Sequence, residues 1–212
     1  MVNIPGTTGN DSLGPGIPGN PDAGTNDTIT ANAGDDSLYG GNGVDSLLGE
    51  AGNDQLFGGA DGDSLFGGNN DDLLEGGFGN DTLVGGSGND AASYASASGA
   101  VTVNLSTGVA SGDAGTDTLS QIEDVIGGYG NDNITGDSLS NRLVGGAGND
   151  TISAGSGNDT VEGGLGNDSL QGGNGTDELS FRGATTGVNA DLGSGTSSGE
   201  GTDSFSGFEN LQ

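Results

Sequence analysis

Aspartate residues recur along this chain at a fixed spacing of eighteen residues. Asp45, Asp63 and Asp81 form one series, and Asp36, Asp54, Asp72 and Asp90 form another. If eighteen residues make one coil of a solenoid, each series stacks into a column of carboxylates that repel one another. A hard divalent cation would relieve this repulsion, and calcium prefers six to eight carboxylate and carbonyl oxygens. Magnesium demands stricter octahedral geometry, and zinc favours His or Cys, neither of which occurs here.

These aspartates belong to a nonapeptide repeat with two physical halves. The first block runs from ANAGDDSLY at 31–39 to GGSGNDAAS at 85–93, and the second from GGYGNDNIT at 127–135 to GGNGTDELS at 172–180. The GGxGxD half predicts a tight turn, because glycine tolerates positive φ and close backbone approach. The remaining three residues predict a very short strand with one inward apolar side chain.

The inward side chains must position the turns. They are Leu38, Leu47, Leu56, Leu65, Leu74 and Leu83, followed by Ile134, Leu143, Ile152, Val161, Leu170 and Leu179. One nine-residue unit cannot bury a single aliphatic group, but stacked units can. We therefore expect an all-β solenoid with a narrow, continuous aliphatic core.

Composition agrees with a cation-dependent fold. The 212 residues include 49 glycines, 31 acidic residues and 2 basic residues, with a net charge of -29 and 29% hydrophobic residues. Such a chain stays disordered unless something neutralises the acid. So few basic residues argue against nucleic-acid binding, and no apolar run reaches membrane-spanning length. Cysteine is absent, which removes disulfides and thiolate sites.

The repeats resemble the RTX family of secreted bacterial proteins, which carry GGxGxDxUx nonapeptides. The resemblance covers about 25–93 and 127–180. It implies a right-handed parallel β-roll of two nonapeptides per coil, with calcium between successive turns on both edges. It also implies that the chain is a segment of a larger protein exported by type I secretion.

In that family one turn supplies the carbonyls at its second and fourth positions and its Asp, and the next coil supplies the first and third carbonyls and its Asp. The implied ligands in the first block are Asn32, Gly34 and Asp36 with Gly49, Ala51 and Asp54; Gly41, Gly43 and Asp45 with Gly58, Ala60 and Asp63; then Gly68, Asp72, Gly76, Asp81, Gly85 and Asp90. In the second block they are Asp132; Gly146, Gly148 and Asp150 with Gly163, Leu165 and Asp168; and Gly155, Gly157 and Asp159 with Gly172, Asn174 and Asp177. Pairing turns eighteen residues apart predicts about ten Ca²⁺ sites.

Some repeats depart from the pattern. In 136–144, Leu139 replaces the fourth-position glycine and Asn141 replaces the aspartate, so we expect weak or empty sites there. Asp61 and Asn70 also replace that glycine, at some cost in positive-φ freedom. All four prolines lie before residue 25, and Asp11 and Asp27 are out of phase with the coil, so we expect a loose leader over 1–24.

The non-repeat segments 94–126 and 181–212 resemble each other, and Tyr94 aligns with Phe181. Each has an alternating strand pattern, a Gly-Thr-Asp turn at Asp117 or Asp203, and an apolar finish. We expect these spacers to cap the roll blocks at 25–93 and 127–180.

We expect no enzyme activity, because nucleophile, His base and zinc motifs are missing and acidic pairs occur everywhere. The leading hypothesis is a calcium-binding module that folds on Ca²⁺ binding after secretion, as a structural segment of an extracellular or bacterial cell-surface protein. The alternative is a Ca²⁺-dependent accessory module that binds a polysaccharide or a surface for an attached enzyme or adhesin. The outward Tyr39, Phe57 and Phe66 form an apolar strip whose role is left open.

Overall fold

The computed structural model describes residues 3–7, 9, 11–14 and 24–212, and every regular element in this part of the chain is a β-strand. No helix of a length and apolar character suited to crossing a membrane occurs among these residues. The chain divides into two compact units. The first unit comprises residues 1–94 and 109–122, and the second comprises residues 95–108 and 123–212.

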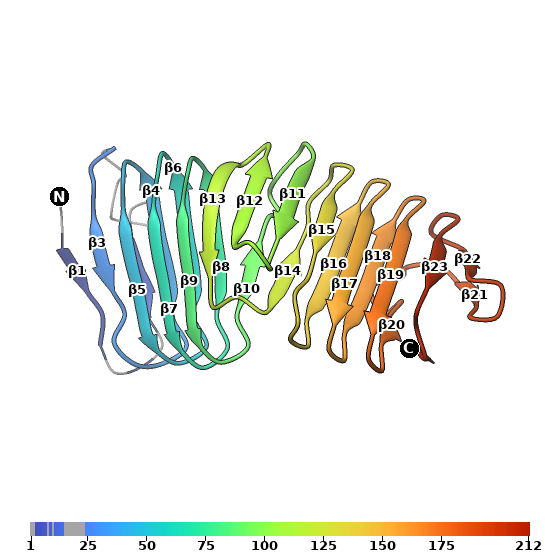
Figure 1. Ribbon diagram of the computed structural model, residues 1–212. Helices are drawn as coiled ribbons and strands as arrows, with labels where there is room; N and C mark the ends of the chain where they lie inside the picture. The colour runs from blue at the N-terminus through green and yellow to red at the C-terminus, as the bar shows by residue number, and fades with distance from the viewer. Residues whose placement is uncertain (1–2, 8, 10, 15–23) are drawn as a thin grey trace. The chain divides into compact units, whose positions relative to one another are not determined.

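The first unit is a stack of coils with strands on two faces (Figure 1). One face has the order β1 (Asn3–Pro5), β3 (Thr28–Thr30), β5 (Ser46–Ala51), β7 (Ser64–Asn69), β9 (Thr82–Ser87), β13 (Gly115–Ser120) and β12 (Val109–Gly112). The other has the order β2 (Ser12–Leu13), β4 (Ser37–Asn42), β6 (Gln55–Ala60), β8 (Leu73–Phe78) and β10 (Ala91–Ser93). Strands that follow one another from β3 to β10 lie on opposite faces, so two nonapeptides make one coil.

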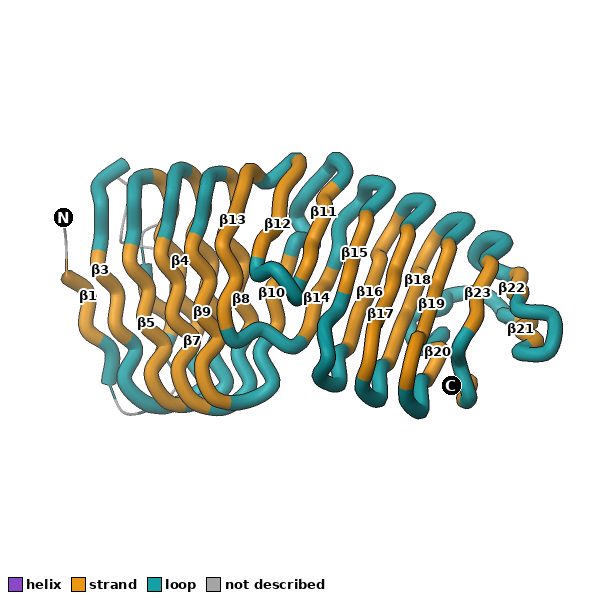
Figure 2. Tube along the Cα trace, viewed as in Figure 1, coloured by secondary structure: helices purple, strands orange, loops and turns teal. Residues whose placement is uncertain are grey.

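The second unit repeats this plan. One face has the order β11 (Val101–Asn104), β15 (Asn133–Thr135), β17 (Thr151–Ser156), β19 (Ser169–Asn174), β23 (Ser204–Ser206), β22 (Thr196–Ser198) and β21 (Asn189–Asp191). The other has the order β14 (Asp124–Ile126), β16 (Arg142–Ala147), β18 (Thr160–Leu165), β20 (Glu178–Leu179) and β24 (Asn210–Leu211). Figure 2 shows turns joining the repeat strands along the edges of each stack.

The eighteen-residue register places like residues on top of one another. Leu65 of β7 pairs with Leu47 of β5 and Leu83 of β9, all in parallel. Every predicted inward side chain is buried, with an exposed fraction of 0–3%. The predicted aliphatic core is thereby confirmed within the parallel stack of each unit. Ala92, at the end of the first block, is also fully buried and pairs with Leu74.

The turns of the first block have a positive φ at the fourth repeat position. Asp61 and Asn70 replace glycine there and both adopt φ of 76°, whereas Leu139, at the same position in the second block, does not have a positive φ. Asp and Asn tolerate a positive φ better than most residues do.

Part of the segment predicted as a loose leader pairs with the roll. β1 pairs with β3 and β2 with β4, both in parallel, and the backbone N–H of Asp11 donates to Oδ1 of Asp36. Twenty-five residues separate these two aspartates, more than one coil, which explains the loss of sequence phase. Of the leader, residues 1–2, 8, 10 and 15–23 lie outside the described residues.

Each spacer contains an antiparallel hairpin, unlike the repeats. In the first unit β12 pairs antiparallel with β13, and β13 continues the parallel stack on β9. In the second unit β22 pairs antiparallel with β21 and β23, and β23 stacks in parallel on β19. The Gly-Thr-Asp turn predicted at Asp117 is wrong, because Gly115, Thr116 and Asp117 are the first residues of β13 and pair with β12. At Asp203 the same tripeptide directly precedes β23.

Candidate metal centre

The buried aspartates form columns in which one carboxylate oxygen of each residue has a fixed partner. The backbone N–H of one aspartate donates to Oδ1 of the aspartate one coil further along, at 2.7–3.0 Å. The first unit holds the columns Asp36–Asp54–Asp72–Asp90 and Asp27–Asp45–Asp63–Asp81–Asp117. The second holds Asp132–Asp150–Asp168–Asp203 and Asp159–Asp177. These bonds fix the carboxylates along the edges of the coils.

The other carboxylate oxygen, Oδ2, is buried without a hydrogen-bond donor in at least nine of these aspartates. They are Asp36, Asp54, Asp63, Asp72, Asp81, Asp150, Asp159, Asp168 and Asp177. The exposed fraction of these nine residues is 0–3%. An enclosed polar atom without a partner costs about 1–3 kcal/mol, and a charged one costs more. Repeated in phase, this feature indicates a bound cation.

The first glycine of the repeat lies beside Oδ2. A Cβ placed on Gly58 would lie 2.5 Å from Oδ2 of Asp63 and 2.5 Å from the carbonyl oxygen of Gly76. A similar arrangement recurs at Gly145. Two oxygens from successive coils therefore face one small space, which the missing side chain of glycine leaves open.

The electrostatics of the columns favour a cation. Burial raises the pKa of Asp63, Asp72 and Asp150 to about 7. Neighbouring carboxylates contribute to this rise in pKa, and the backbone hydrogen bond at Oδ1 opposes it. Charged aspartate is thus disfavoured here until a positive charge lies beside it.

The remaining ligands must come from the backbone. Among the described residues, no three acidic, histidine or cysteine side chains gather into a metal-binding group. The N–H of Ala51 donates to the carbonyl of Asn32 at 3.1 Å, and the N–H of Gly34 donates to the carbonyl of Ala51 at 2.9 Å. Each carbonyl keeps a second lone pair. Buried carboxylate and carbonyl oxygens together fit calcium, which accepts a variable number of oxygen ligands.

Two positions of the second unit differ from the other column members. Asp132, predicted as a ligand, accepts the N–H of Val101 at Oδ1 and the N–H of Gly128 at Oδ2, both at 2.8 Å. Its carboxylate is therefore satisfied by the backbone. Asn141 accepts the N–H of Asp137 at Oδ1 and donates from Nδ2 to the carbonyl of Glu123 at 2.8 Å. The side chain of Asn141 is neutral and both of its polar atoms are hydrogen-bonded, so this position does not require a cation.

A second ladder runs along the turns through the residue before each aspartate. The side-chain oxygen of this residue accepts the backbone N–H of its equivalent one coil later, at 2.7–3.4 Å. The series are Asp35–Asn53–Asp71–Asn89 and Asn131–Asn149–Asn167. Sequence reasoning treated this position as variable, although the recurrent Asn-Asp step could have revealed it.

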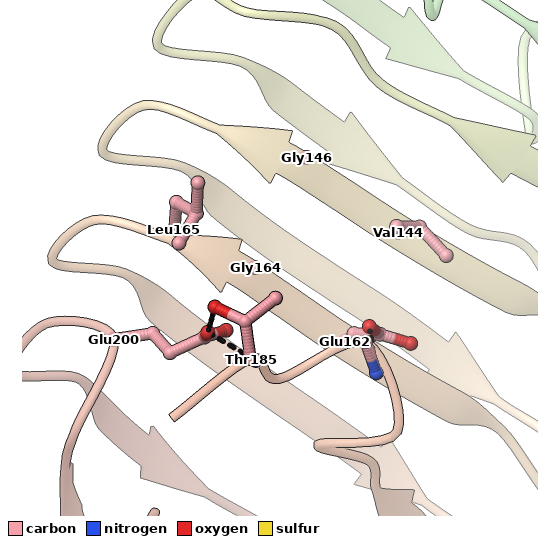
Figure 3. A pocket seen from close by; sticks show the side chains of 8 residues that line it. Val144, Gly146, Glu162, Gly164, Leu165, Thr185 and Glu200 are labelled. Carbon is pink, nitrogen blue, oxygen red and sulfur yellow. Dashed lines mark hydrogen bonds between the residues drawn. The ribbon is translucent and has the colours of Figure 1, made fainter. Parts of the chain in front are cut away.

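The second unit also has a hollow on the outer face of β16 and β18, against the spacer (Figure 3). Its two carboxylates hold backbone in place: Glu200 Oε1 accepts the N–H and hydroxyl of Thr185, and Glu162 Oε1 accepts the N–H of Gly183. Glu162 also lies 3.8 Å from Arg142. These contacts give both glutamates a structural role in fastening the spacer.

Comparison with known proteins agrees with the geometry of the turns. Comparison with curated proteins gave no match. The RTX calcium-binding nonapeptide repeat matches residues 23–56, 57–91, 122–152, 135–170 and 154–183. These matches cover more than half of the chain, and they contain all nine aspartates with an enclosed Oδ2. The chain therefore belongs to the RTX calcium-binding nonapeptide repeat family.

Proposed function

We propose that this chain is a structural module that folds when calcium fills the turns of its roll, after export to a calcium-rich exterior. The observation that carries the proposal is the row of enclosed Oδ2 atoms without a donor. In calcium-poor surroundings these carboxylates repel one another and oppose folding. Where calcium is abundant, the free energy of ion binding becomes free energy of folding.

The residues that would hold the ions are the aspartates of the columns and the turn carbonyls beside them. In the column through Asp63, the ion next to Oδ2 would also contact the carbonyl of Gly76, because both oxygens face the space over Gly58. We propose the same role for the other ligand sets predicted from the repeats, except Asp132. The nine enclosed oxygens support a total near ten ions, which would reduce the net charge of -29 to roughly -9.

We further propose that the repeat blocks at 25–93 and 127–180 load calcium and that the spacers at 94–126 and 181–212 close them. The family suggests export by type I secretion and a place in a larger extracellular or cell-surface protein. An acidic chain that stays unfolded without calcium suits passage through a narrow channel.

Far-UV circular dichroism during a calcium titration tests the proposal. We expect a cooperative gain of β signal with calcium, little change with magnesium, and reversal by EGTA. Magnesium is the matched control because it carries the same charge but demands octahedral geometry and keeps its waters. A chain that is fully folded in EGTA and insensitive to calcium would refute calcium-driven folding.

A second candidate function is calcium-dependent binding of a polysaccharide or surface. It is favoured by outward aromatic rings: Tyr39 stacks on Phe57 with ring centroids 5.1 Å apart, and Tyr39 and Phe66 are 38% and 39% exposed. Aromatic rings at an exposed surface supply apolar contact area for a ligand. Glycan-array binding that disappears with chelator and with Tyr39→Ala would support it, whereas no binding in calcium would exclude it.

A further inference from the structure

One of the two aspartate columns of the first unit, the column through Asp63 and Asp81, ends on a carboxylate that has a different partner from those in the repeats. Asp117 continues the column, because its Oδ1 accepts the backbone N–H of Asp81 at 3.0 Å. Its Oδ2, however, accepts a hydrogen bond from the hydroxyl of Tyr94 at 3.1 Å. Asp117 is 2% exposed and Tyr94 is 4% exposed, so water does not compete for this bond.

The second unit reaches the same result with another residue. Asp203 ends its column by accepting the N–H of Asp168 at Oδ1, at 3.0 Å. Its Oδ2 accepts a hydrogen bond from the hydroxyl of Ser197, and both residues are at least nine-tenths buried. In both units a side-chain hydroxyl thus occupies the oxygen that has no donor in the repeats.

The two spacers supply this hydroxyl from different positions, Tyr94 in the first and Ser197 in the second. The aligned partner of Tyr94 is Phe181, which has no hydroxyl. In the first hairpin Ala110 lies opposite Asp117, and in the second Ser197 lies opposite Asp203, where its N–H donates to the aspartate carbonyl. Loss of the hydroxyl at one position is therefore matched by its gain at the other. This exchange argues that the hydroxyl itself is required.

At the head of this column in the first unit, the hydroxyl lies on the other carboxylate oxygen. Asp27, 6% exposed, donates its N–H to Oδ1 of Asp45, and its own Oδ1 accepts the hydroxyl of Thr25 at 2.9 Å, where the later column members accept a backbone N–H. At the head of the neighbouring column, Oδ2 of Asp11 accepts the hydroxyl of Thr7 at 2.9 Å. A terminal aspartate has a repeat turn on one side only, so an ion there would lack half of its carbonyl ligands. A hydroxyl needs no such turn, because it satisfies the oxygen with one donated hydrogen bond.

We propose that Tyr94 and Ser197 each close one aspartate column, one in each unit, with a hydroxyl in place of a calcium ion, so that Asp117 and Asp203 are not calcium ligands. This inference rests on the proposed calcium function, and it divides the aspartates into two classes. Asp81 and Asp168, one coil further inward, take calcium at Oδ2. Asp117 and Asp203 form the last, metal-independent step of one column in each unit, whereas the column through Asp159 and Asp177 continues to Glu209, whose Oε2 accepts the N–H of Asp177 at 2.8 Å.

The first test compares two identical substitutions one coil apart, Asp117→Asn and Asp81→Asn. Asparagine keeps an oxygen that can accept the N–H of the preceding coil, and at 117 its amide can donate to the oxygen of Tyr94. Bound calcium is counted by equilibrium dialysis of the whole chain. We expect Asp117→Asn to retain the wild-type number and Asp81→Asn to lose at least one ion. Loss of an ion in Asp117→Asn would overturn the proposal.

The second test transfers the hydroxyl within the first spacer. Tyr94→Phe should lower the urea midpoint, and Tyr94→Phe with Ala110→Ser should recover most of that loss, because serine then lies opposite Asp117 as Ser197 lies opposite Asp203. Ala110→Ser alone is the control and should give no gain. An unchanged or higher calcium number in Tyr94→Phe agrees with the proposal, and a lower number contradicts it. Failure of Ala110→Ser to recover stability would also overturn it.

These outcomes are separable from failure of calcium-driven folding. If the wild-type urea midpoint does not depend on calcium concentration, the proposed function is wrong. The recovery of Tyr94→Phe by Ala110→Ser can still be measured in that case, because it depends on a hydrogen bond and not on an ion.

Discussion

The substitution Asp63→Asn should change the stability of the roll in opposite directions with and without calcium. Asp63 lies in the middle of its column, 2% exposed, with Oδ1 bonded to the N–H of Asp45 and Oδ2 enclosed without a donor. Asparagine preserves the acceptor for Asp45 and removes the charge. Without calcium the charge only costs stability, and with calcium it holds the ion.

The structure sets the size of both effects. Burial and neighbouring carboxylates raise the pKa of Asp63 from 3.8 to about 7, so at pH above 7 the charged form costs at most about 4 kcal/mol in the calcium-free roll. Asparagine removes that cost, and the calcium-free roll becomes more stable. With calcium at a hundred times its dissociation constant, loss of one ion removes about 2.7 kcal/mol. Asp63 borders the turns of both Asp45 and Asp81, and loss of two ions would remove about 5 kcal/mol.

Urea unfolding followed by circular dichroism measures both effects, in saturating calcium and in EGTA with an osmolyte that favours the folded state. The matched control is Asp71→Asn, which removes the same charge from an exposed residue outside the columns. Asparagine there can still accept the N–H of Asn89, as Asn53 does for Asp71. The control should show little change in either condition. A variant that is less stable in both conditions, or more stable in both, would refute the assignment of this carboxylate to a cation.

Three further predictions concern the core, the pH and the outer ladder. Leu65→Ala should lower the unfolding free energy of the calcium-loaded roll by about 2–5 kcal/mol, because Leu65 is fully buried; an unchanged urea midpoint would contradict the continuous core. In EGTA, the roll should gain stability as the pH falls from about 7 toward about 4, because the folded state holds protons on Asp72 and Asp150 that the unfolded chain releases; β signal that declines with acid would contradict this. Asn149→Ala should lower the unfolding free energy by about 1 kcal/mol, because the N–H of Asn167 loses its acceptor, while the calcium number measured by dialysis stays unchanged; loss of an ion would give Asn149 a role in the site.

The period of the sequence was sufficient to predict most of the fold. A spacing of eighteen residues between like positions means that each aliphatic residue, such as Leu47, lies against its equivalent, Leu65. Parallel stacking repeats one set of contacts in every coil, so the spacing of residues in the sequence predicts which residues are in contact in the fold. The positive φ at Asp61 and Asn70 also follows from the repeat, because both residues occupy the position that glycine holds in the neighbouring turns of the first block.

Features outside the period could not be predicted in this way. The pairing of Asp11 with Asp36 spans twenty-five residues, and no repeat length relates the two. Asp132 has the sequence of a ligand, yet the backbone N–H groups of Val101 and Gly128 satisfy both of its oxygens. Such partners depend on how a non-repeating segment folds back on the roll.

The sequence by itself thus determined the coil, the aliphatic core and the columns of aspartate, because each follows from a short pattern repeated in phase. The tertiary structure alone decided which carboxylate oxygens lack a donor and which have one. Asp81 and Asp117 look alike in sequence, but only Asp117 receives a hydroxyl, from Tyr94 twenty-three residues away. The physical reason is that a buried oxygen is satisfied by whatever donor the fold brings within hydrogen-bond distance, and that distance is set by packing and not by position along the chain.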